Sequence, residues 1–406
     1  MKLLNKPRSL VCLILGTVVF LSNCKKDHTD AETPEPRAVA ANVAARTEVT
    51  GQAQFSVSTE NTGGKDATEG SSKVIDNNID TKFLIFSHQS SFYMQFEFPA
   101  NTQVAAYTLT SANDASERDP SNWTITASTN GTTWTELDHR EYEMFAKRKQ
   151  SKTYNFVNSN SYKFYRINVK VLFGQTNPIF QLAEIKLFSV PQNQQSLVPN
   201  NTLETIVEGS NTLIFTDKTG TFNATTKAGF ITVFKANYQR MANTFNINAP
   251  KTQVFVIDSA YEGVAATYGG SVIRYDPRYF VNNAKDIDVV THEMMHVVQS
   301  YKFNLPNTGW ITEGIADYVR YIFGYNNPGA NWSLPAYSSN QNYTDAYRVT
   351  ARFFAWLENH GYQGIIIKLD KAMRDGTYDV NVFWSANANG KTVDQLWQDY
   401  AANPAL

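Results

Sequence analysis

Short stretches of alternating hydrophobic and polar residues fill the first half of the chain. Clear examples lie at residues 91–98, 122–129, 152–157 and 163–173. Polar turn sequences such as NTGG, DPSN and TNGTTW separate these stretches. A period of two is typical of strands with one buried face, and short strands at this spacing predict an all-β sandwich over residues 48–190.

A different pattern begins near residue 209, where longer hydrophobic repeats replace the alternation. Strand-like runs come first and helical runs follow; they lie at 211–217, 251–259, 291–303, 312–323 and 346–360. Strands followed by helices predict an α+β domain over residues 209–406. The stretch between the two domains is polar and rich in Pro, Gln and Asn, so we place a linker at 191–208.

The N-terminus has the pattern of an export signal. Basic residues precede an apolar run of about 13 residues that ends near Leu21. We therefore predict a signal peptide at residues 1–23, followed by a charged, Pro-containing tether at 24–47. No later apolar run reaches the ~18 residues that a membrane-spanning helix needs.

The residues from Leu21 to Cys24 resemble the lipobox of bacterial lipoproteins, where cleavage precedes a cysteine that is then lipidated. Asn23 departs from the small residue that usually stands at this point. The resemblance implies lipidation of Cys24 and a lipid anchor at a bacterial membrane, at the outer membrane or the cell surface. An ordinary secreted protein that is cleaved nearby is the alternative.

The charge and the cysteine content of the chain argue against nucleic-acid binding and against thiol chemistry. The net charge is −1 and the charged residues are spread along the chain, so no basic face for a nucleic-acid partner is predicted. The two cysteines are Cys12 in the signal and Cys24. If Cys24 carries lipid, the exported chain has no thiol for a disulfide, a metal site or a nucleophile.

The sequence THEMMHVVQS at 291–300 places two histidines four residues apart. On a helix, His292, Glu293 and His296 share one face with Val289, and the two imidazoles lie one turn apart. Both can therefore reach a single zinc ion, which accepts neutral imidazole nitrogen. With six histidines in 406 residues, an accidental HExxH is expected in roughly one chain in three hundred.

A catalytic zinc needs a third protein ligand and one open position. Downstream, Pro306 and Gly309 break the first helix, Thr312 can cap a second one, and Glu313 and Asp317 are one turn apart on it. Taken alone, this pair could be a solvated acidic face.

HExxH followed by ExxxD resembles the gluzincin metallopeptidases. The stretches VVTHEMMHVVQSY, GWITEGIADYVRY and YRVTARFFAWLE also resemble the basic secretory protein peptidases, over about residues 209–390. The resemblance implies a zincin-like fold with zinc held by His292, His296 and Glu313. It also implies that Asp317 orients a zinc histidine and that Glu293 is the general base.

Two further features of this domain are predicted less sharply. In gluzincins the strand before the metal helix is the sheet edge that holds substrate, so Val272 to Tyr275 is expected to pair with an extended peptide. An edge strand without a ligand is the alternative. Tyr318, Tyr343 and Tyr347 are candidates for a second donor to the oxyanion, and the sequence does not choose among them.

Three stretches of the first domain resemble the discoidin family, also called coagulation-factor type C or galactose-binding-like modules: SSKVIDNNIDTKF, SANDASERDPSNWTITASTNGTTWTEL and FQLAEIKLF. The resemblance implies an eight-stranded jelly-roll sandwich. It also implies a structural Ca²⁺ ion bound by the carbonyls of Lys73, Asn78 and Ala183 and the side chains of Asp76, Thr81 and Glu184. A polar turn without an ion is the alternative.

The family binds sugars or lipids through loops at one end of the sandwich. Candidate loops lie at 86–91, 113–121 and 172–178, where His88, Arg118 and Phe173 are residues that hydrogen-bond or stack on sugars. Each is also compatible with an ordinary loop position, so no sugar-binding residue is assigned. Trp123 and Trp134 lie in the strand pattern and are predicted to be core.

Together these patterns predict a zinc-dependent endopeptidase that hydrolyses peptide bonds of extracellular proteins or glycoproteins. A carbohydrate-binding accessory domain would bind glycans on the substrate. The alternative is a surface glycan-binding or adhesion lipoprotein with an inactive peptidase-like domain. A zinc hydrolase of some other bond is a further alternative, because the activated-water chemistry is shared.

Overall fold

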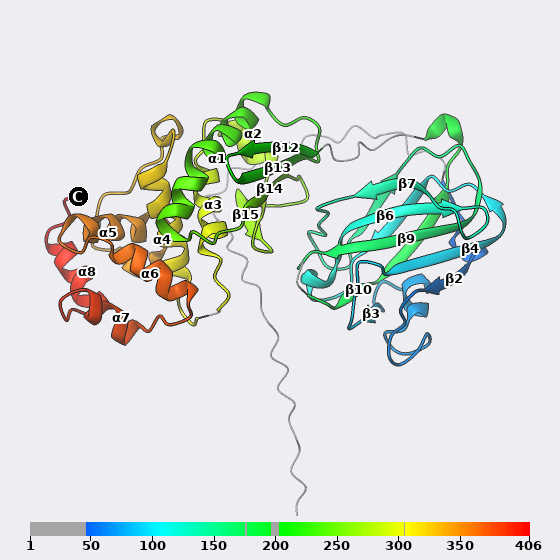
Figure 1. Ribbon diagram of the computed structural model, residues 1–406, viewed down its shortest axis with the longest axis horizontal. Coiled ribbons are helices and arrows are strands. Elements are labelled where there is room, and N and C mark those ends of the chain that lie inside the picture. The colour runs from blue at the N-terminus through cyan, green and yellow to red at the C-terminus, as the bar shows by residue number, and fades with distance from the viewer. Residues whose placement is uncertain (1–45, 175–176, 196–202, 304) are drawn as a thin grey trace, which may run out of the picture.

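The computed structural model describes residues 46–174, 177–195, 203–303 and 305–406. They form two folded domains (Figure 1), an all-β domain and a mixed domain that carries the helices. The predicted signal peptide, Cys24 and nearly all of the tether lie outside the described residues. Within the described part, no helix is long and apolar enough to cross a membrane.

The N-terminal domain is a sandwich of antiparallel sheets, as predicted. One sheet has the strand order β2 (Gln54–Val57), β4 (Tyr93–Thr102), β9 (Tyr162–Leu172), β6 (Pro120–Ser128) and β7 (Thr135–Arg140). The other has the order β1 (Thr47–Glu48), β11 (Glu184–Ser189), β5 (Ala106–Thr110) and β8 (Ser151–Asn155). A short pair, β3 (Phe83–Ile85) and β10 (Phe180–Leu182), completes the domain.

The alternating pattern of the sequence becomes the core between these sheets. Trp123 is buried there, and its Nε1 donates to the Tyr107 hydroxyl at 2.8 Å, which donates in turn to Asp138 Oδ2 at 2.8 Å. The prediction for Trp123 is therefore confirmed. Trp134 lies outside the core instead, half-buried beneath the Arg166 guanidinium at 3.9 Å, because it falls just before β7 in the turn that follows β6.

The C-terminal domain is built on a five-stranded sheet. Its strand order is β12 (Leu203–Glu208), β13 (Asn211–Asp217), β14 (Thr252–Ile257), β16 (Val272–Tyr275) and β15 (Ala265–Tyr268). The three central strands are parallel and the two outer pairs are antiparallel. This domain confirms the predicted mixture of strands and helices.

Eight α-helices accompany the sheet in the described residues of this domain. They are α1 (Ala224–Phe245), α2 (Pro277–Asn282), α3 (Val289–Gln299), α4 (Gly309–Phe323), α5 (Tyr347–Asn359), α6 (Ile365–Arg374), α7 (Val380–Asn387) and α8 (Val393–Ala402). Strands β12 to β15 and α2 lie on the side of this domain nearer the sandwich, and α5 to α8 lie farthest from it (Figure 1).

Three sequence expectations need correction here. The predicted linker contains β12, which pairs with β13 and so belongs to the sheet. Val272–Tyr275 forms β16, which lies between β14 and β15, so the edge strand beside helix α3 is β15 instead. Helix α4 begins at Gly309 after Thr308, which leaves Thr312 inside the helix rather than at its cap.

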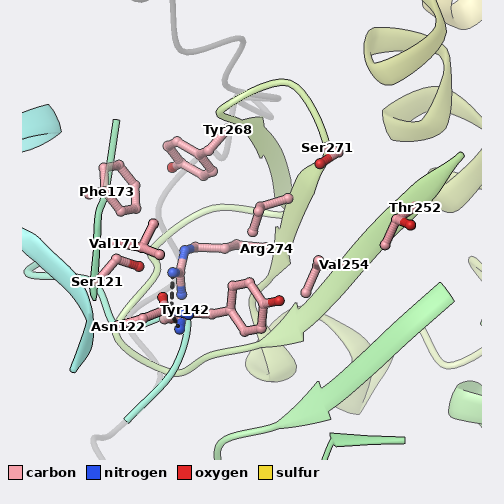
Figure 2. A pocket seen from close by; sticks show the side chains of 11 residues that line it. Ser121, Asn122, Tyr142, Val171, Phe173, Thr252, Val254, Tyr268, Ser271 and Arg274 are labelled. Atoms are coloured by element: carbon pink, nitrogen blue, oxygen red, sulfur yellow. Dashed lines mark hydrogen bonds between the residues drawn. The ribbon is translucent and has the colours of Figure 1, made fainter. Parts of the chain in front are cut away.

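The two faces of the C-terminal sheet are covered differently. Phe255 and Ile257 of β14 pack into the core that the helices cover. Val254 and Val256, which alternate with them, pack on the opposite face with Tyr142 of the N-terminal domain. The sandwich domain therefore covers the sheet face that the helices leave open, and Figure 2 shows side chains of both domains meeting there.

Candidate metal centre

Helix α3 presents two imidazoles toward one point. Val290, Met294 and Val297 bury the opposite side of the helix in the core. This packing leaves His292 and His296 together on the remaining face, with their Nε2 atoms 3.2 Å apart. The i and i+4 spacing of the sequence has therefore produced the expected pair on one helix face.

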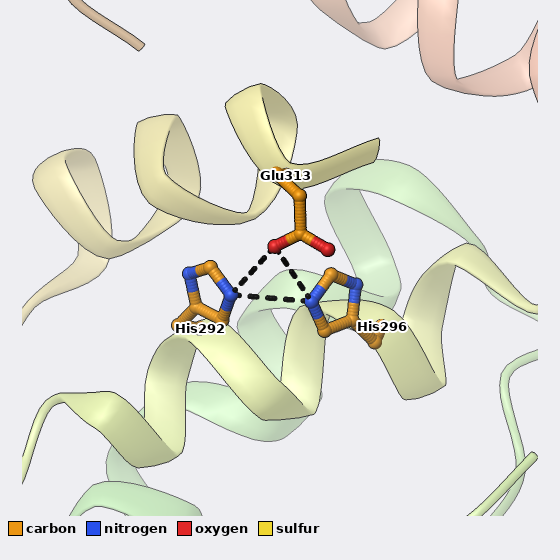
Figure 3. A group of neighbouring side chains, drawn as sticks. All are labelled: His292, His296 and Glu313. Atoms are coloured by element: carbon orange, nitrogen blue, oxygen red, sulfur yellow. Dashed lines mark hydrogen bonds and ion pairs between the residues drawn. The ribbon is translucent and has the colours of Figure 1, made fainter. Parts of the chain in front are cut away.

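Helix α4 supplies a carboxylate to the same point. Glu313 Oε2 lies 3.3 Å from His292 Nε2 and 3.6 Å from His296 Nε2 (Figure 3). In the described part of the chain, these three side chains form the group of His, Cys, Asp and Glu residues that could hold a metal ion. The convergence expected from the sequence is thus present in the fold.

The close approach of α5 to α4 depends on Gly314, the residue after Glu313. A Cβ atom at this position would meet Thr350 Cγ2 at 2.3 Å and Thr350 Cβ at 2.8 Å. Because such distances require a neighbour to move, a glycine is needed where the two helices touch. The contact holds the first turns of α4, and with them Glu313, against the rest of the helical core.

The Nδ1 atoms of both imidazoles also have hydrogen-bond partners. Asp317 Oδ1 lies 2.7 Å from His292 Nδ1, as predicted for an orienting carboxylate. Gln299 Oε1 lies 2.8 Å from His296 Nδ1, and Gln299 Nε2 donates to the Thr312 carbonyl at 2.9 Å. Hydrogen bonds of this kind hold a histidine so that its other nitrogen faces a metal. Gln299 was not anticipated from the sequence, although its place three residues after His296 puts it on the same face.

The donor set fits a bound cation. Glu313 Oε2 is buried and makes no hydrogen bond. Burial opposes ionisation of Glu313, but the adjacent His296 and His292 hold its pKa well below the usual range. Burial alone would lower the pKa of His296, and the Glu313 carboxylate reverses this and raises it. The histidines thus stabilise the Glu313 carboxylate, and a bound cation would take over this role by replacing the imidazole protons.

Glu293 lies beside this group but outside it. Its carboxylate is fully buried, and Oε2 accepts a hydrogen bond from Thr267 Oγ1 of β15 at 2.9 Å. Burial raises the pKa of Glu293, and the two histidines and Thr267 partly oppose the rise. A buried carboxylate with a raised pKa, next to a candidate metal site, suits a general base. Thr267 was not anticipated from the sequence, because it lies on another element.

Of the three tyrosines proposed from the sequence, one lies against the centre. The Tyr347 ring stacks on the His292 ring, with centroids 6.2 Å apart and planes 17° apart. Tyr343 instead donates its hydroxyl to Asp394 at 2.8 Å, and Tyr318 is packed into the core. Tyr347 has a φ of 47°, a left-handed backbone conformation that side-chain-bearing residues adopt at a cost and that clusters at functional sites.

Comparison with known protein families identifies both domains. Residues 211–400 match the family BSP, described as a peptidase of plants and bacteria, and residues 54–185 match the F5/8 type C domain. The C-terminal domain belongs to the BSP peptidase family. The N-terminal domain is an F5/8 type C, or discoidin, domain.

Individual proteins with detectable similarity are more distant. A family 32 carbohydrate-binding module of Clostridium perfringens NanJ, solved with galactose, is 17% identical; the match covers 36% of this chain and all of that chain, with a TM-score of 0.30. An F5/8 type C domain of Bacteroides fragilis is also 17% identical, over 36% of this chain and 97% of the other, with a TM-score of 0.31.

One curated relative matches a short region. It is a peptide-N(4)-(N-acetyl-β-glucosaminyl)asparagine amidase of Arabidopsis thaliana, 35% identical over 91 residues. The match covers 21% of this chain and 12% of the amidase.

In the discoidin domain, the loop predicted to hold Ca²⁺ does meet β11. Asp76 Oδ1 accepts from the Asn78 backbone at 2.9 Å, and Thr81 Oγ1 donates to Asp76 Oδ2 at 2.8 Å. Glu184 Oε2 is buried without a hydrogen bond. Burial, followed by the charge of Asp76, raises the pKa of Glu184 to about 7. A cation would relieve both effects, so this region fits the ion, and the ion itself stays a prediction.

The candidate sugar-binding residues of the discoidin domain have other partners. His88 Nε2 lies 3.1 Å from the Val169 carbonyl, and its ring packs on Phe180. Phe173 packs on Tyr268 of the BSP domain, with ring centroids 5.2 Å apart. The structure therefore uses Phe173 at the domain interface, a role that the sequence of one domain could not indicate.

We predict that the metal centre depends on both its ligands and its orienting carboxylate. Glu313→Ala should abolish binding of a divalent metal, and Asp317→Asn should weaken it by about 10- to 100-fold because His292 loses its orientation. Chelator-competition titration and metal analysis measure the affinity. Asp399→Asn, at a carboxylate that pairs with Lys391 on the C-terminal side of the domain, is the matched control. Unchanged affinity in Asp317→Asn would refute the orienting role.

We also predict that Ca²⁺ stabilises the discoidin domain. With a dissociation constant of about 10⁻⁴ to 10⁻³ M, as in extracellular modules, ~10 mM Ca²⁺ should add about 1.5–3 kcal/mol to the free energy of unfolding. Thermal unfolding with and without Ca²⁺ measures the effect. Glu184→Gln and Asp76→Asn should remove it, whereas Asp66→Asn at an exposed position should not. An equal response in all four proteins would argue against the site.

Proposed function

We propose that this protein is a zinc-dependent endopeptidase that hydrolyses peptide bonds of extracellular proteins or glycoproteins. In this proposal it is exported, held at a bacterial membrane through lipid on Cys24, and assisted by a carbohydrate-binding discoidin domain. The observation that carries the proposal is the meeting of His292, His296 and Glu313, with Glu293 beside them but outside the donor set.

The donor set favours zinc over Ca²⁺ and Mg²⁺. Two imidazoles and one carboxylate match the ligands of catalytic zinc sites, which keep one position open, whereas Ca²⁺ and Mg²⁺ prefer all-oxygen sites. When bound, a zinc ion at this place supplies Lewis acidity to a substrate carbonyl and lowers the pKa of a water molecule.

The protein's own groups then carry the proton and the charge. Glu293 takes a proton from the attacking water as the water oxygen bonds to the carbonyl carbon. It passes this proton to the leaving nitrogen as the C–N bond breaks. Tyr347, the one proposed tyrosine that contacts His292, is suited to donate its hydroxyl to the developing oxyanion. Asp317 and Gln299 keep the imidazoles oriented throughout.

Strand β15 is suited to hold the substrate backbone. Within the described residues it pairs only with β16, so its other edge can accept an extended peptide. Thr267 of the same strand bonds to Glu293, so a peptide at this edge would run past the general base. This assignment moves the predicted substrate strand from Val272–Tyr275 to its neighbour.

The glycoprotein part of the proposal draws on the comparisons. The NanJ module was solved with galactose, and the Arabidopsis relative is an amidase of glycosylated asparagine. A module that grips a sugar raises the local concentration of an attached polypeptide. The amidase match also favours a second candidate, hydrolysis of the glycan–asparagine amide, since the same base and metal suit any amide.

We expect Glu293→Gln to lose about 10²- to 10⁴-fold in cleavage of casein or a mucin-type glycoprotein while keeping its metal, because only the proton carrier is removed. Mass spectrometry of the products follows the reaction. Glu136→Gln, at an exposed site of the sandwich, is the control. Release of free glycan without peptide cleavage would favour the amidase. A metal-loaded wild type that cleaves nothing would favour the adhesion protein.

We expect Tyr347→Phe to lower kcat by about 10²-fold with KM and metal content unchanged, since one oxyanion donor is typically worth that much. Steady-state kinetics on a fluorogenic peptide measure both constants. Tyr343→Phe removes a hydroxyl whose partner is Asp394 and serves as the matched control. Equal kcat in the two variants would exclude the role proposed for Tyr347.

A further inference from the structure

We infer that the discoidin domain helps to position the residues of the peptidase site, in addition to any role in binding glycans. By packing against the outer face of the BSP sheet, it fixes edge strand β15, and Thr267 of this strand positions Glu293. The effect of the interface on catalysis rests on the proposed function. Thr267 is then a positioning residue, and full activity requires the contact between the two domains.

The two faces of strand β15 contact different partners. Thr267 points to α3, where its hydroxyl lies 2.9 Å from Glu293 Oε2 and 3.1 Å from the Glu293 carbonyl. Ala266 and Tyr268, the residues on either side, belong to a cluster that includes Met144 and Phe173 of the discoidin domain. Neighbouring residues of β15 therefore contact the domain interface and Glu293, the proposed general base.

The outer side of the sheet is anchored by an aromatic and an arginine contact. Phe173 packs on Tyr268 with ring centroids 5.2 Å apart, and the Arg274 guanidinium carbon lies 5.6 Å from the centre of the Phe173 ring. Arg274 of β16 also donates from Nη2 to the Tyr142 carbonyl at 2.5 Å (Figure 2). Its Nη1 donates to Asp258 at 2.6 Å. These contacts hold both β15 and the strand that pairs with it.

A buried ion pair secures the same interface at β13. Lys218, directly after this strand, lies 2.8 Å from Glu143 Oε1 of the discoidin domain, and both side chains are less than a tenth exposed. Lys218 also donates to the Glu141 carbonyl at 2.8 Å, and Lys152 pairs with the other oxygen of Glu143. Of these ion pairs only Lys218–Glu143 crosses the interface, because Lys152 and Glu143 belong to the same domain, and it fixes the place where the two domains meet.

Within its own domain, strand β15 is held by β16, by the Thr267 bond to α3, and by Tyr261, whose hydroxyl donates to the Ala265 carbonyl at 2.8 Å. It is four residues long, and in the described chain it has a neighbouring strand on one side only. The interface beside Tyr268 and Arg274 encloses a cavity of about 260 Å³, lined by both domains (Figure 2). Because the Phe173 ring lines this cavity and packs on Tyr268, its loss would leave Tyr268 and its strand freer to shift away from α3.

The first test separates a positioning hydroxyl from general stability, in the full chain with a short unglycosylated peptide as substrate. We expect Thr267→Val to lower kcat by about tenfold or more with KM and metal content unchanged, because misplacing a base by ~1 Å costs up to 10²-fold. Thr267→Ser, which keeps the hydroxyl, should retain most of the activity. Equal kcat in wild type, Thr267→Val and Thr267→Ser would overturn the positioning role.

The second test disturbs the interface from the discoidin side. Phe173→Ala should lower kcat on the same unglycosylated peptide, where glycan binding cannot contribute. Phe164→Ala, at the far end of β9 and outside the interface, should not. Hydrogen–deuterium exchange of residues 265–268 should rise by about tenfold in Phe173→Ala only.

These measurements also separate this inference from the proposed function. A wild type that cleaves the peptide, with Phe173→Ala and Phe164→Ala equally active and equally protected, would overturn the inference and leave the peptidase intact. A wild type without peptidase activity would end the proposed function, and the exchange rates would still decide whether the interface holds β15.

Discussion

The C-terminal domain is organised around three possible metal-ligand atoms that meet in a buried place. Two imidazole nitrogens and a carboxylate oxygen lie 3.2–3.6 Å apart, and the oxygen makes no hydrogen bond. Such a group is unfavourable in a protein interior unless a cation or protons neutralise it. The surrounding structure therefore has to hold the side chains together, and Asp317 and Gln299 do so through the outer ring nitrogens.

This constraint extends outward through the helices and the sheet. Gly314 lets α5 press against α4 next to Glu313. On the other side of α3, the edge strand places a hydroxyl against Glu293. The sandwich domain then covers the face of the sheet that the helices do not reach. Each layer limits the movement of the one inside it, which is how a preorganised site is built.

Sequence predicted the parts of this arrangement that depend on local periodicity. The spacing of His292 and His296, and that of Glu313 and Asp317, determines which side chains share a helix face, and the resemblance to the gluzincins implied that the two faces meet. Strand order and domain docking depend on contacts between distant segments. The edge strand was therefore assigned to Val272–Tyr275 instead of β15, and Thr267 and Phe173 were given no role at the site.

Helices cover one face of the C-terminal sheet and the sandwich covers the other, and this limits where the chain can be cut into fragments. A fragment cut between β11 and β12 would turn Val254, Val256 and Val272 toward water and leave Lys218 without its carboxylate. An apolar sheet face of this kind invites self-association. The border between the two homology regions is thus a poor place to make a recombinant truncation, and exchange of the sandwich for another module would require a matching docking face.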